Sequence, residues 1–256
     1  MALRRALTIA VTVSAAVATA LAPPVAAEPV VGPAAAITAP EGPAQSWLVA
    51  DIDSGKILAG KDPYGLHAPA STIKALLAMV VLDNLAPNAA VRATAAHTQV
   101  ECSCVGLVPG QVYTARQLLD GLLMVSGNDA ANLLGDMLGG YRAAIARMTA
   151  KAASLGARRT RAMSPSGLDG PGWETLTSPH DLALIYRAAL TYPIIAQIMR
   201  QPSAQFPDRG GYKTLTAQNK LLTRYPGDLA GKTGYTDLAG DTFVTVAQRD
   251  GRRLVV

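Results

Sequence analysis

Residues 69–81 read Pro-Ala-Ser-Thr-Ile-Lys-Ala-Leu-Leu-Ala-Met-Val-Val, and this stretch decides the fold. Its apolar residues recur at intervals of three and four, which predicts a helix. Residues three apart share one face of a helix, so the Ser71 hydroxyl is expected near the Lys74 amine. A serine hydroxyl is a weak nucleophile that needs an adjacent base. A neutral lysine can be that base, and burial or a second nearby cation lowers the pKa of a lysine.

Before this stretch, the sequence predicts a pair of short strands. Residues 47–50 (Trp-Leu-Val-Ala) are apolar, residues 53–55 (Asp-Ser-Gly) form turns readily, and residues 56–59 (Lys-Ile-Leu-Ala) return. Two such runs around a turn are typical of a β-hairpin.

After it, the pattern predicts further helices. Thr114 and Gln117 form a capping box that opens a helix through Leu123. Residues 141–155 form another helix that ends at Gly156. A third begins at residues 178–181 (Ser-Pro-His-Asp), which combine a cap, a proline in the first turn and an acid at the positive end of the helix dipole.

Beyond Leu229 the pattern returns to strands, at residues 241–248 and from Arg253 onward. Strands at both ends of the chain with helices between them predict an α+β fold, in which one antiparallel sheet is packed with helices. Since the chain stops at Val256, inside the last predicted strand, we expect that strand to be truncated.

Two more motifs follow the Ser-x-x-Lys motif in order. Residues 126–128 (Ser-Gly-Asn) come at the end of an apolar helix, and residues 232–234 (Lys-Thr-Gly) lie on a predicted strand. The serine is able to relay a proton, the asparagine to bind a peptide group, and the Lys-Thr pair to hold a carboxylate. Gly234 lacks a side chain, which lets an extended peptide lie against the strand edge. Chance gives all three motifs in this order roughly a few times in ten thousand such chains.

These motifs resemble those of the active-site-serine penicillin-recognising enzymes. From about Trp47 to its end, the chain looks like a low-molecular-mass penicillin-binding D-alanyl-D-alanine carboxypeptidase of the β-lactamase-like superfamily. The matching segments are residues 53–58, 69–74, 126–131, 164–168, 219–222, 231–236 and 239–240. The resemblance implies an antiparallel sheet flanked by helices plus an all-helical subdomain. It also implies removal of the terminal D-alanine from peptidoglycan stem peptides, without a cofactor or metal.

The resemblance implies a role for each residue of the first two motifs. Ser71 would be the acylated nucleophile, and Lys74 the base that activates it. Ser126 would pass a proton toward the leaving D-alanine, and Asn128 would bind the acyl-side peptide. β-Lactam antibiotics would act as substrate mimics that acylate Ser71 and leave slowly.

The third motif would hold the substrate. Lys232 and Thr233 would receive its terminal carboxylate, and Gly234 would let the peptide approach the strand. The backbone N–H groups of Ser71 and Tyr235 would form the oxyanion hole, where one donor is typically worth about 3 kcal/mol of transition-state stabilisation.

The N-terminus predicts export. Arg4 and Arg5 precede an apolar run over residues 6–22, and residues 25–27 (Val-Ala-Ala) suit a signal peptidase. We expect a signal peptide over residues 1–27, a Pro/Ala-rich linker over residues 28–44 and a catalytic domain over residues 45–256 that is incomplete at its C-terminus. An uncleaved membrane anchor is the alternative. The predicted location is the cell wall or periplasmic space, with membrane association left open.

Charge and cysteine content limit the partners. The net charge of +5 falls to +3 without Arg4 and Arg5, and scattered arginines do not favour nucleic acid. Cys102 and Cys104 either form a small disulfide that stiffens a loop or remain loop thiols. No second pair follows them, so no metal site is predicted.

Other enzyme classes fit less well. A Ser-His-Asp triad would use His180 and Asp181, but the sequence has no G-x-S-x-G elbow, and His67 and His97 are expected to be surface or packing residues. A class A β-lactamase needs a glutamate that activates water, and Glu174 lacks the expected Glu-x-x-Leu-Asn context. A DD-endopeptidase or a non-enzymatic penicillin sensor on the same scaffold stays open.

Overall fold

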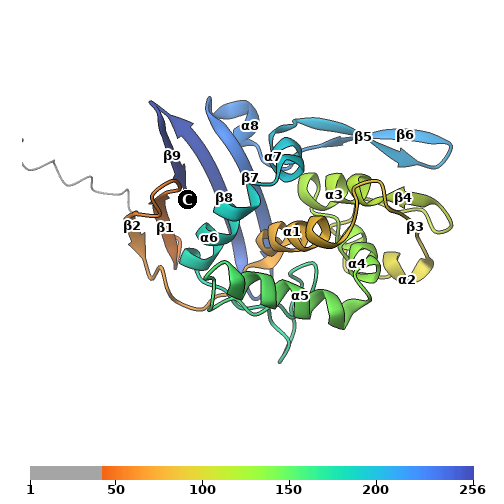
Figure 1. The fold of residues 1–256 in the computed structure, drawn as a ribbon, viewed down its shortest axis with the longest axis horizontal. Coiled ribbons are helices and arrows are strands. Elements are labelled where there is room, and N and C mark those ends of the chain that lie inside the picture. Colours follow the sequence, from red (N-terminus) through yellow and green to blue (C-terminus); the bar gives the residue numbers. More distant parts are fainter. Residues whose placement is uncertain (1–41) are drawn as a thin grey trace, which may run out of the picture. The chain divides into compact units, whose positions relative to one another are not determined.

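A five-stranded antiparallel sheet is built from both ends of the chain (Figure 1). The computed structural model describes residues 42–256. The strand order is β2-β1-β9-β8-β7. These strands are β1 (Trp47–Asp51), β2 (Ile57–Lys61), β7 (Asp228–Thr236), β8 (Gly240–Arg249) and β9 (Arg252–Val255). The predicted α+β class and the predicted N-terminal hairpin are therefore confirmed.

The last strand lies inside the sheet. Val255 of β9 pairs with Ala50 of β1 on one side and with Val246 of β8 on the other. Although β9 has four residues, its backbone groups therefore find partners in both neighbouring strands. The two ends of the described chain are joined through this strand, and β7 forms one edge of the sheet.

Helices cover the sheet and extend beyond it on one side (Figure 1). A 3₁₀ helix η1 (Ala70–Ile73) leads into α1, and α6 packs on the sheet through β1, β8 and β9. The helices are α1 (Lys74–Asn84), α2 (Ala95–Thr98), α3 (Ala115–Met124), α4 (Asn128–Met137), α5 (Tyr141–Ser154), α6 (Pro179–Ala189), α7 (Pro193–Arg200) and α8 (Leu221–Arg224).

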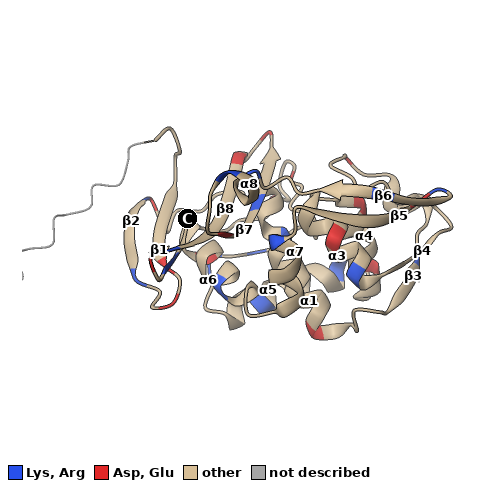
Figure 2. Ribbon diagram, turned by 90° about the horizontal axis from the view of Figure 1, so that it is seen from above, with Lys and Arg blue, Asp and Glu red and all other residues tan. Residues whose placement is uncertain are grey.

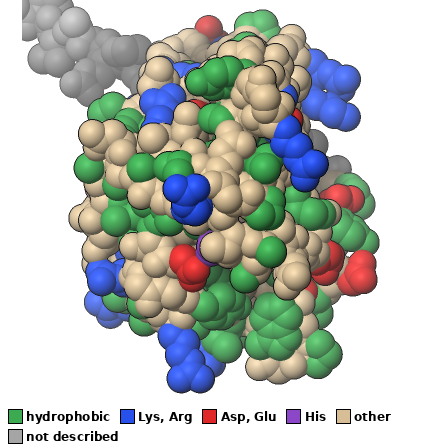
Figure 3. Space-filling view, turned by 90° about the vertical axis from the view of Figure 1, so that its right-hand side faces the viewer, with side chains coloured by type: hydrophobic (Ala, Val, Ile, Leu, Met, Phe, Trp, Pro, Cys, Tyr) green, Lys and Arg blue, Asp and Glu red, His purple; other side chains and the backbone are tan. Residues whose placement is uncertain are grey.

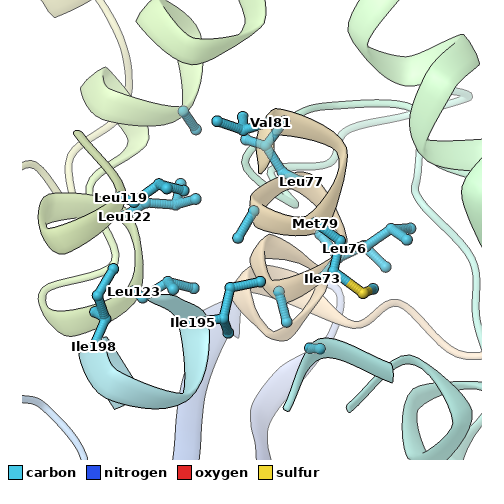
Figure 4. Packing of buried hydrophobic residues seen from close by; sticks show 14 of the residues in the cluster. Ile73, Leu76, Leu77, Met79, Val81, Leu119, Leu122, Leu123, Ile195 and Ile198 are labelled. Atoms are coloured by element: carbon cyan, nitrogen blue, oxygen red, sulfur yellow. The ribbon is translucent and has the colours of Figure 1, made fainter. Parts of the chain in front are cut away.

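Helix α1 is the centre of the core. Its first eight residues are buried on every side, and α3, α5, α6 and α7 pack around it. In Figure 4, Leu77 of α1 lies among side chains that include Leu119 and Leu122 of α3, with Ile195 of α7 nearby. Each fully buried leucine contributes about 2 kcal/mol of transfer free energy. The N-terminus of α1, which carries Lys74, is therefore held in a fixed place.

The predicted helix boundaries rest on local hydrogen bonds. Thr114 and Gln117 form both bonds of the capping box at the start of α3. The Ser178 hydroxyl accepts from the backbone N–H of Asp181 at the start of α6. Gly156 follows α5 with a φ of 83°, a left-handed conformation that glycine adopts freely.

Other elements were not predicted from sequence. Strands β5 (Ser203–Asp208) and β6 (Gly211–Thr216) form a hairpin that projects beside α3, although no strand was expected between the N-terminal hairpin and Leu229. Pro207 inside β5 hides the strand pattern, because proline is rare in strands. Strands β3 (Ala90–Arg92) and β4 (Val112–Thr114) have three residues each, too few to show an alternating pattern.

Charged residues are spread over the elements. Figure 2 shows lysine, arginine and acidic residues on several helices and strands, and Figure 3 shows basic side chains separated by other residues on one face. Among the helices of residues 42–256, none alone has the length and apolar composition of a membrane span. The pair α6 and α7, bent by 105° at its break, meets those two criteria jointly.

The predicted export signal and linker lie mostly before the described part of the chain. The predicted signal peptide, residues 1–27, and all of the predicted linker except residues 42–44 lie outside the described residues.

Candidate active site

Four segments that are distant in sequence meet around Lys74. They are η1 with the start of α1, the loop between α3 and α4, the loop of residues 164–168, and strand β7. The sequence predicted that the first, second and fourth of these carry chemistry. The structure brings all four together and adds backbone groups that no motif marks.

The amine of Lys74 is fully buried and has three close oxygen neighbours. Its Nζ lies 2.6 Å from Ser71 Oγ, 2.8 Å from Asn128 Oδ1 and 2.7 Å from the carbonyl oxygen of Ser166. The predicted contact between Ser71 and Lys74 is present. Ser71 is the second residue of η1 and Lys74 is the first residue of α1, so the pair spans a 3₁₀-to-α junction.

The environment favours the neutral form of Lys74. Burial lowers the pKa of Lys74 well below its usual range, and the nearby positive charge of Lys232 lowers it further, while Asp129 opposes the shift. Burial alone lowers the pKa of Lys232 to about 7. Two buried lysines with depressed pKa values in one site are therefore available for proton transfer and for anion binding.

The hydrogen-bond partners of Lys74 orient its lone pair. A neutral amine has two N–H donors and one lone pair. The amide oxygen of Asn128 and the carbonyl of Ser166 are able only to accept, so they take the two N–H groups. In the neutral amine the lone pair is then left for the hydroxyl of Ser71, whose oxygen lies 2.6 Å away and which is able to donate its proton to the nitrogen. This arrangement is able to activate a serine hydroxyl as a nucleophile.

The second motif forms the turn between α3 and α4. Ser126 has a left-handed φ of 64°, which is uncommon for a residue with a side chain, and it is nearly fully buried. Gly127 donates its backbone N–H to the carbonyl of Gly121, and Asn128 begins α4. The turn thus connects Ser126 directly to the residue that contacts Lys74.

A disulfide loop holds Asn128 from the other side. The Asn128 side-chain amide donates to the carbonyl of Glu101 at 2.7 Å, and its backbone N–H donates to the carbonyl of Ser103 at 2.6 Å. Cys102 and Cys104 form a disulfide in the same loop. Sequence left the state of these cysteines open, and the structure places their bridge directly behind a candidate site residue.

Asp129 fixes the continuation of that loop. Its buried carboxylate accepts backbone N–H groups from Val105 at 2.8 Å, Gly106 at 2.8 Å and Leu107 at 2.9 Å. Three charge-assisted bonds hold the loop against α4. No role for Asp129 was predicted from the sequence, although it directly follows a predicted site residue, Asn128.

Strand β7 presents the third motif at the open edge of the sheet. Lys232 is buried and donates to the carbonyl of Thr233 at 2.6 Å, while the Thr233 hydroxyl contacts Gln218 at 3.3 Å. The Tyr235 side chain is 62% exposed, and its hydroxyl contacts Asp237. Within residues 42–256, β7 pairs with β8 alone, so its other edge has no strand partner there and is able to pair with an extended peptide.

Two glycines allow the segments to approach closely. A Cβ at Gly234 would lie 2.7 Å from the backbone nitrogen of Ser71, and a Cβ at Gly167 would lie 2.0 Å from the carbonyl oxygen of Ala70. The sequence predicted that Gly234 lets an extended peptide lie against the edge of this strand. The structure gives it a second role, because its lack of a side chain brings β7 against the N-terminus of η1.

The competing site residues lie apart from this arrangement. The ring of His180 packs against Tyr64 at a tilt of 41°. Its Nδ1 is 3.5 Å from Asp181, whose carboxylate also accepts from the backbone N–H of Arg159 and the hydroxyl of Thr160. Within residues 42–256, no carboxylate hydrogen bonds to Ser71 or Lys74, and no group of acidic, histidine and cysteine side chains has the arrangement of a metal site.

Comparison with known proteins gives a consistent result. A family model described as D-alanyl-D-alanine carboxypeptidase matches residues 34–256. The chain is 58% identical over 226 residues to the D-alanyl-D-alanine carboxypeptidase DacB2 of Mycobacterium tuberculosis, covering 88% of this chain and 78% of that protein.

Solved structures agree with this match. The crystal structure of a D-alanyl-D-alanine carboxypeptidase from Mycobacterium tuberculosis H37Rv matches with a TM-score of 0.85 at 58% identity, covering 88% of this chain and 85% of that one. The Streptomyces K15 DD-transpeptidase matches with a TM-score of 0.80 at 28% identity, covering 86% and 90%. The predicted fold, with a sheet, flanking helices and a helical region, is confirmed.

The disulfide loop generates a first prediction. The double variant Cys102→Ser, Cys104→Ser should be acylated by a fluorescent penicillin with a second-order rate constant on the order of 10-fold lower than that of the wild type. Without the bridge, the loop carbonyls that hold Asn128 are less well fixed. Dithiothreitol donates two electrons and two protons to the disulfide and becomes a cyclic disulfide itself, which leaves two thiols on the protein. The wild-type protein treated with it should be acylated more slowly by the same factor. Dithiothreitol should leave the double variant unchanged. Equal rates for all samples would show that the bridge does not position Asn128.

Proposed function

Since this chain belongs to the D-alanyl-D-alanine carboxypeptidase family, we propose that Ser71 attacks the peptide bond before the terminal D-alanine of a peptidoglycan stem peptide. The protein is a serine-type D-alanyl-D-alanine carboxypeptidase that works through an acyl-enzyme and is acylated by penicillins. The observation that supports Ser71 and Lys74 as the reacting pair is the distance of 2.6 Å between Ser71 Oγ and Lys74 Nζ, in a site where Lys74 is fully buried.

Acylation follows from the neutral state of Lys74. Its lone pair takes the proton of Ser71 as Oγ bonds to the carbonyl carbon of the substrate. The bond from that carbon to the nitrogen of D-alanine then breaks, and the proton passes to this nitrogen, with Ser126 as the relay. Water hydrolyses the resulting ester by the reverse path and regenerates Ser71. Each step keeps Asn128 and Ser166 bonded to the amine.

The developing oxyanion is stabilised by backbone donors. We assign the N–H groups of Ser71 and Tyr235 to this role, because Gly234 lets β7 lie directly against Ser71. Donors fixed before the reaction cost no reorganisation when the negative charge forms.

Lys232 and Thr233 supply the site for the terminal carboxylate. The ammonium of Lys232 is buried beside the open edge of β7, where a substrate carboxylate would restore a counter-charge. This site distinguishes a peptide with a free C-terminus from an internal peptide bond. It therefore supports the carboxypeptidase activity over cleavage of cross-linked peptide by an endopeptidase.

The central test measures D-alanine release from diacetyl-L-lysyl-D-alanyl-D-alanine by the purified protein. The wild type should release D-alanine and be labelled by penicillin, and Ser71→Ala should do neither, because the covalent route is gone. Ser154→Ala, which removes an exposed serine hydroxyl, is the matched control and should behave like the wild type. Release by Ser71→Ala would move the nucleophile elsewhere. Penicillin labelling of the wild type without release would favour a sensor or an endopeptidase.

The depressed pKa of Lys232 predicts a pH dependence. The ammonium form binds carboxylate, so kcat/KM should fall as pH rises through about 7, the pKa of Lys232 in the free enzyme. Lys74 must be neutral, so kcat/KM should also fall when the pH drops below its lowered pKa. In Lys232→Met, kcat/KM should be about 10- to 100-fold lower, since a charged hydrogen bond is lost. Its fall near pH 7 should disappear, and a variant that keeps that fall would assign it to another group.

We also propose that the protein is exported and acts outside the cytoplasm. The basic start, the apolar run over residues 6–22 and the Val-Ala-Ala sequence at residues 25–27 support this, as does a substrate that is part of the cell wall. Mass spectrometry of the protein from the producing cells should find an N-terminus at Glu28. Retention of residues 1–27 would favour an uncleaved anchor instead.

A further inference from the structure

A cavity of about 320 Å³ lies beside the catalytic centre, and the proposed mechanism does not use it. Ser166 connects the two, because its carbonyl contacts Lys74 while the same residue lines the cavity. Its lining also includes His97, Asn132, Asp136, Tyr141 and Trp173. We call this space the acyl-side cavity.

Helix α4 leads from the catalytic centre into the acyl-side cavity. Asn128, Asn132 and Asp136 are spaced four residues apart and share one face of the helix. At 1.5 Å per residue, Asn132 lies about 6 Å and Asp136 about 12 Å along the axis from Asn128. A substrate residue next to the scissile bond, if it has a long side chain, can therefore extend along this face as far as Asp136.

Asp136 carries a negative charge that the protein orients and does not neutralise. His97 Nε2 lies 2.7 Å from Asp136 Oδ2. The His97 Nδ1 accepts the backbone N–H of Thr94 at 2.9 Å, so the imidazole has its proton on Nε2 and donates it to Asp136 while remaining neutral. Within residues 42–256, no lysine or arginine forms an ion pair with Asp136, and its side chain is 58% exposed.

The other walls of the cavity suit a methylene chain. Trp173 and Tyr141 are partly exposed large side chains that line it, and the Tyr141 hydroxyl is bonded to the carbonyl of Met163. Aromatic faces accept the apolar stem of a lysine-like side chain and attract its terminal cation. An apolar wall that leads to one free carboxylate matches a side chain that is apolar along its length and cationic at its end.

We propose that the acyl-side cavity binds the side chain of the substrate residue that precedes D-alanyl-D-alanine, and that Asp136 pairs with a free primary amino group at the end of that side chain. This inference rests on the proposed function, because it needs the acyl part of the peptide to sit on Ser71. His97 is then a positioning residue that fixes the carboxylate of Asp136. The site selects stem peptides whose diamino residue has an unmodified side-chain amine.

The test compares two peptides that differ at the amine alone. They are Nα-acetyl-L-lysyl-D-alanyl-D-alanine, with a free ε-amine, and its Nα,Nε-diacetyl form. The wild type should show a kcat/KM about 5-fold higher for the free amine, the size expected for a partly exposed ion pair, and added salt should reduce the preference. In Asp136→Asn the two values should become equal, because the loss falls on the free-amine peptide.

Asp83→Asn is the matched control. It removes the same charge from a carboxylate that pairs with Lys151 and Tyr192 at the far end of α1, and it should keep the 5-fold preference. Equal use of both peptides by the wild type would overturn the inference, and so would an equal loss on both peptides in Asp136→Asn. Turnover of neither peptide by the wild type would instead overturn the proposed function on which the inference rests.

Discussion

The buried amine of Lys74 is the constraint on which the rest of the site depends. A charged ammonium in this position would lose its hydration without gaining a carboxylate partner, so burial favours the neutral amine. A neutral amine has two protons to donate, and Asn128 and Ser166 accept both. The remaining lone pair is left for Ser71, and the reactivity that we propose for Ser71 follows from this distribution of hydrogen bonds.

The fold supplies this arrangement by fixing four separate segments around one helix terminus. Helices α3, α5, α6 and α7 pack around α1, and this packing fixes the backbone of Lys74 at the start of the helix. Asn128 is held between Lys74 and the loop that contains the disulfide, and Asp129 fixes the continuation of that loop. Gly167 and Gly234 let the remaining two segments come within contact distance. Residues with no part in the chemistry therefore determine its geometry.

Sequence predicted the parts of the site that depend on side-chain type. Ser71, Lys74, Ser126, Asn128 and the Lys-Thr-Gly motif carry chemically distinctive groups at regular spacings, and the apolar pattern places the first two at a helix start. Sequence did not predict the carbonyl groups of Glu101, Ser103 and Ser166, because every residue has a carbonyl and its partner depends on the path of a loop. The same limit hid the His97–Asp136 pair, whose members are 39 residues apart. It also hid the interior position of β9, which depends on pairing with β1 on one side and β8 on the other.

The central claim is that Lys74 is a neutral amine at physiological pH. An NMR titration of protein labelled with ¹³Cε-lysine measures this directly, since the chain has 7 lysines and the signal of Lys74 is identified by its loss in Lys74→Met. The account predicts that this signal has the chemical shift of a neutral amine at pH 7 and titrates well below the usual lysine range. A signal that stays charged at pH 7 and titrates near the ordinary pKa of 10.5 would contradict it.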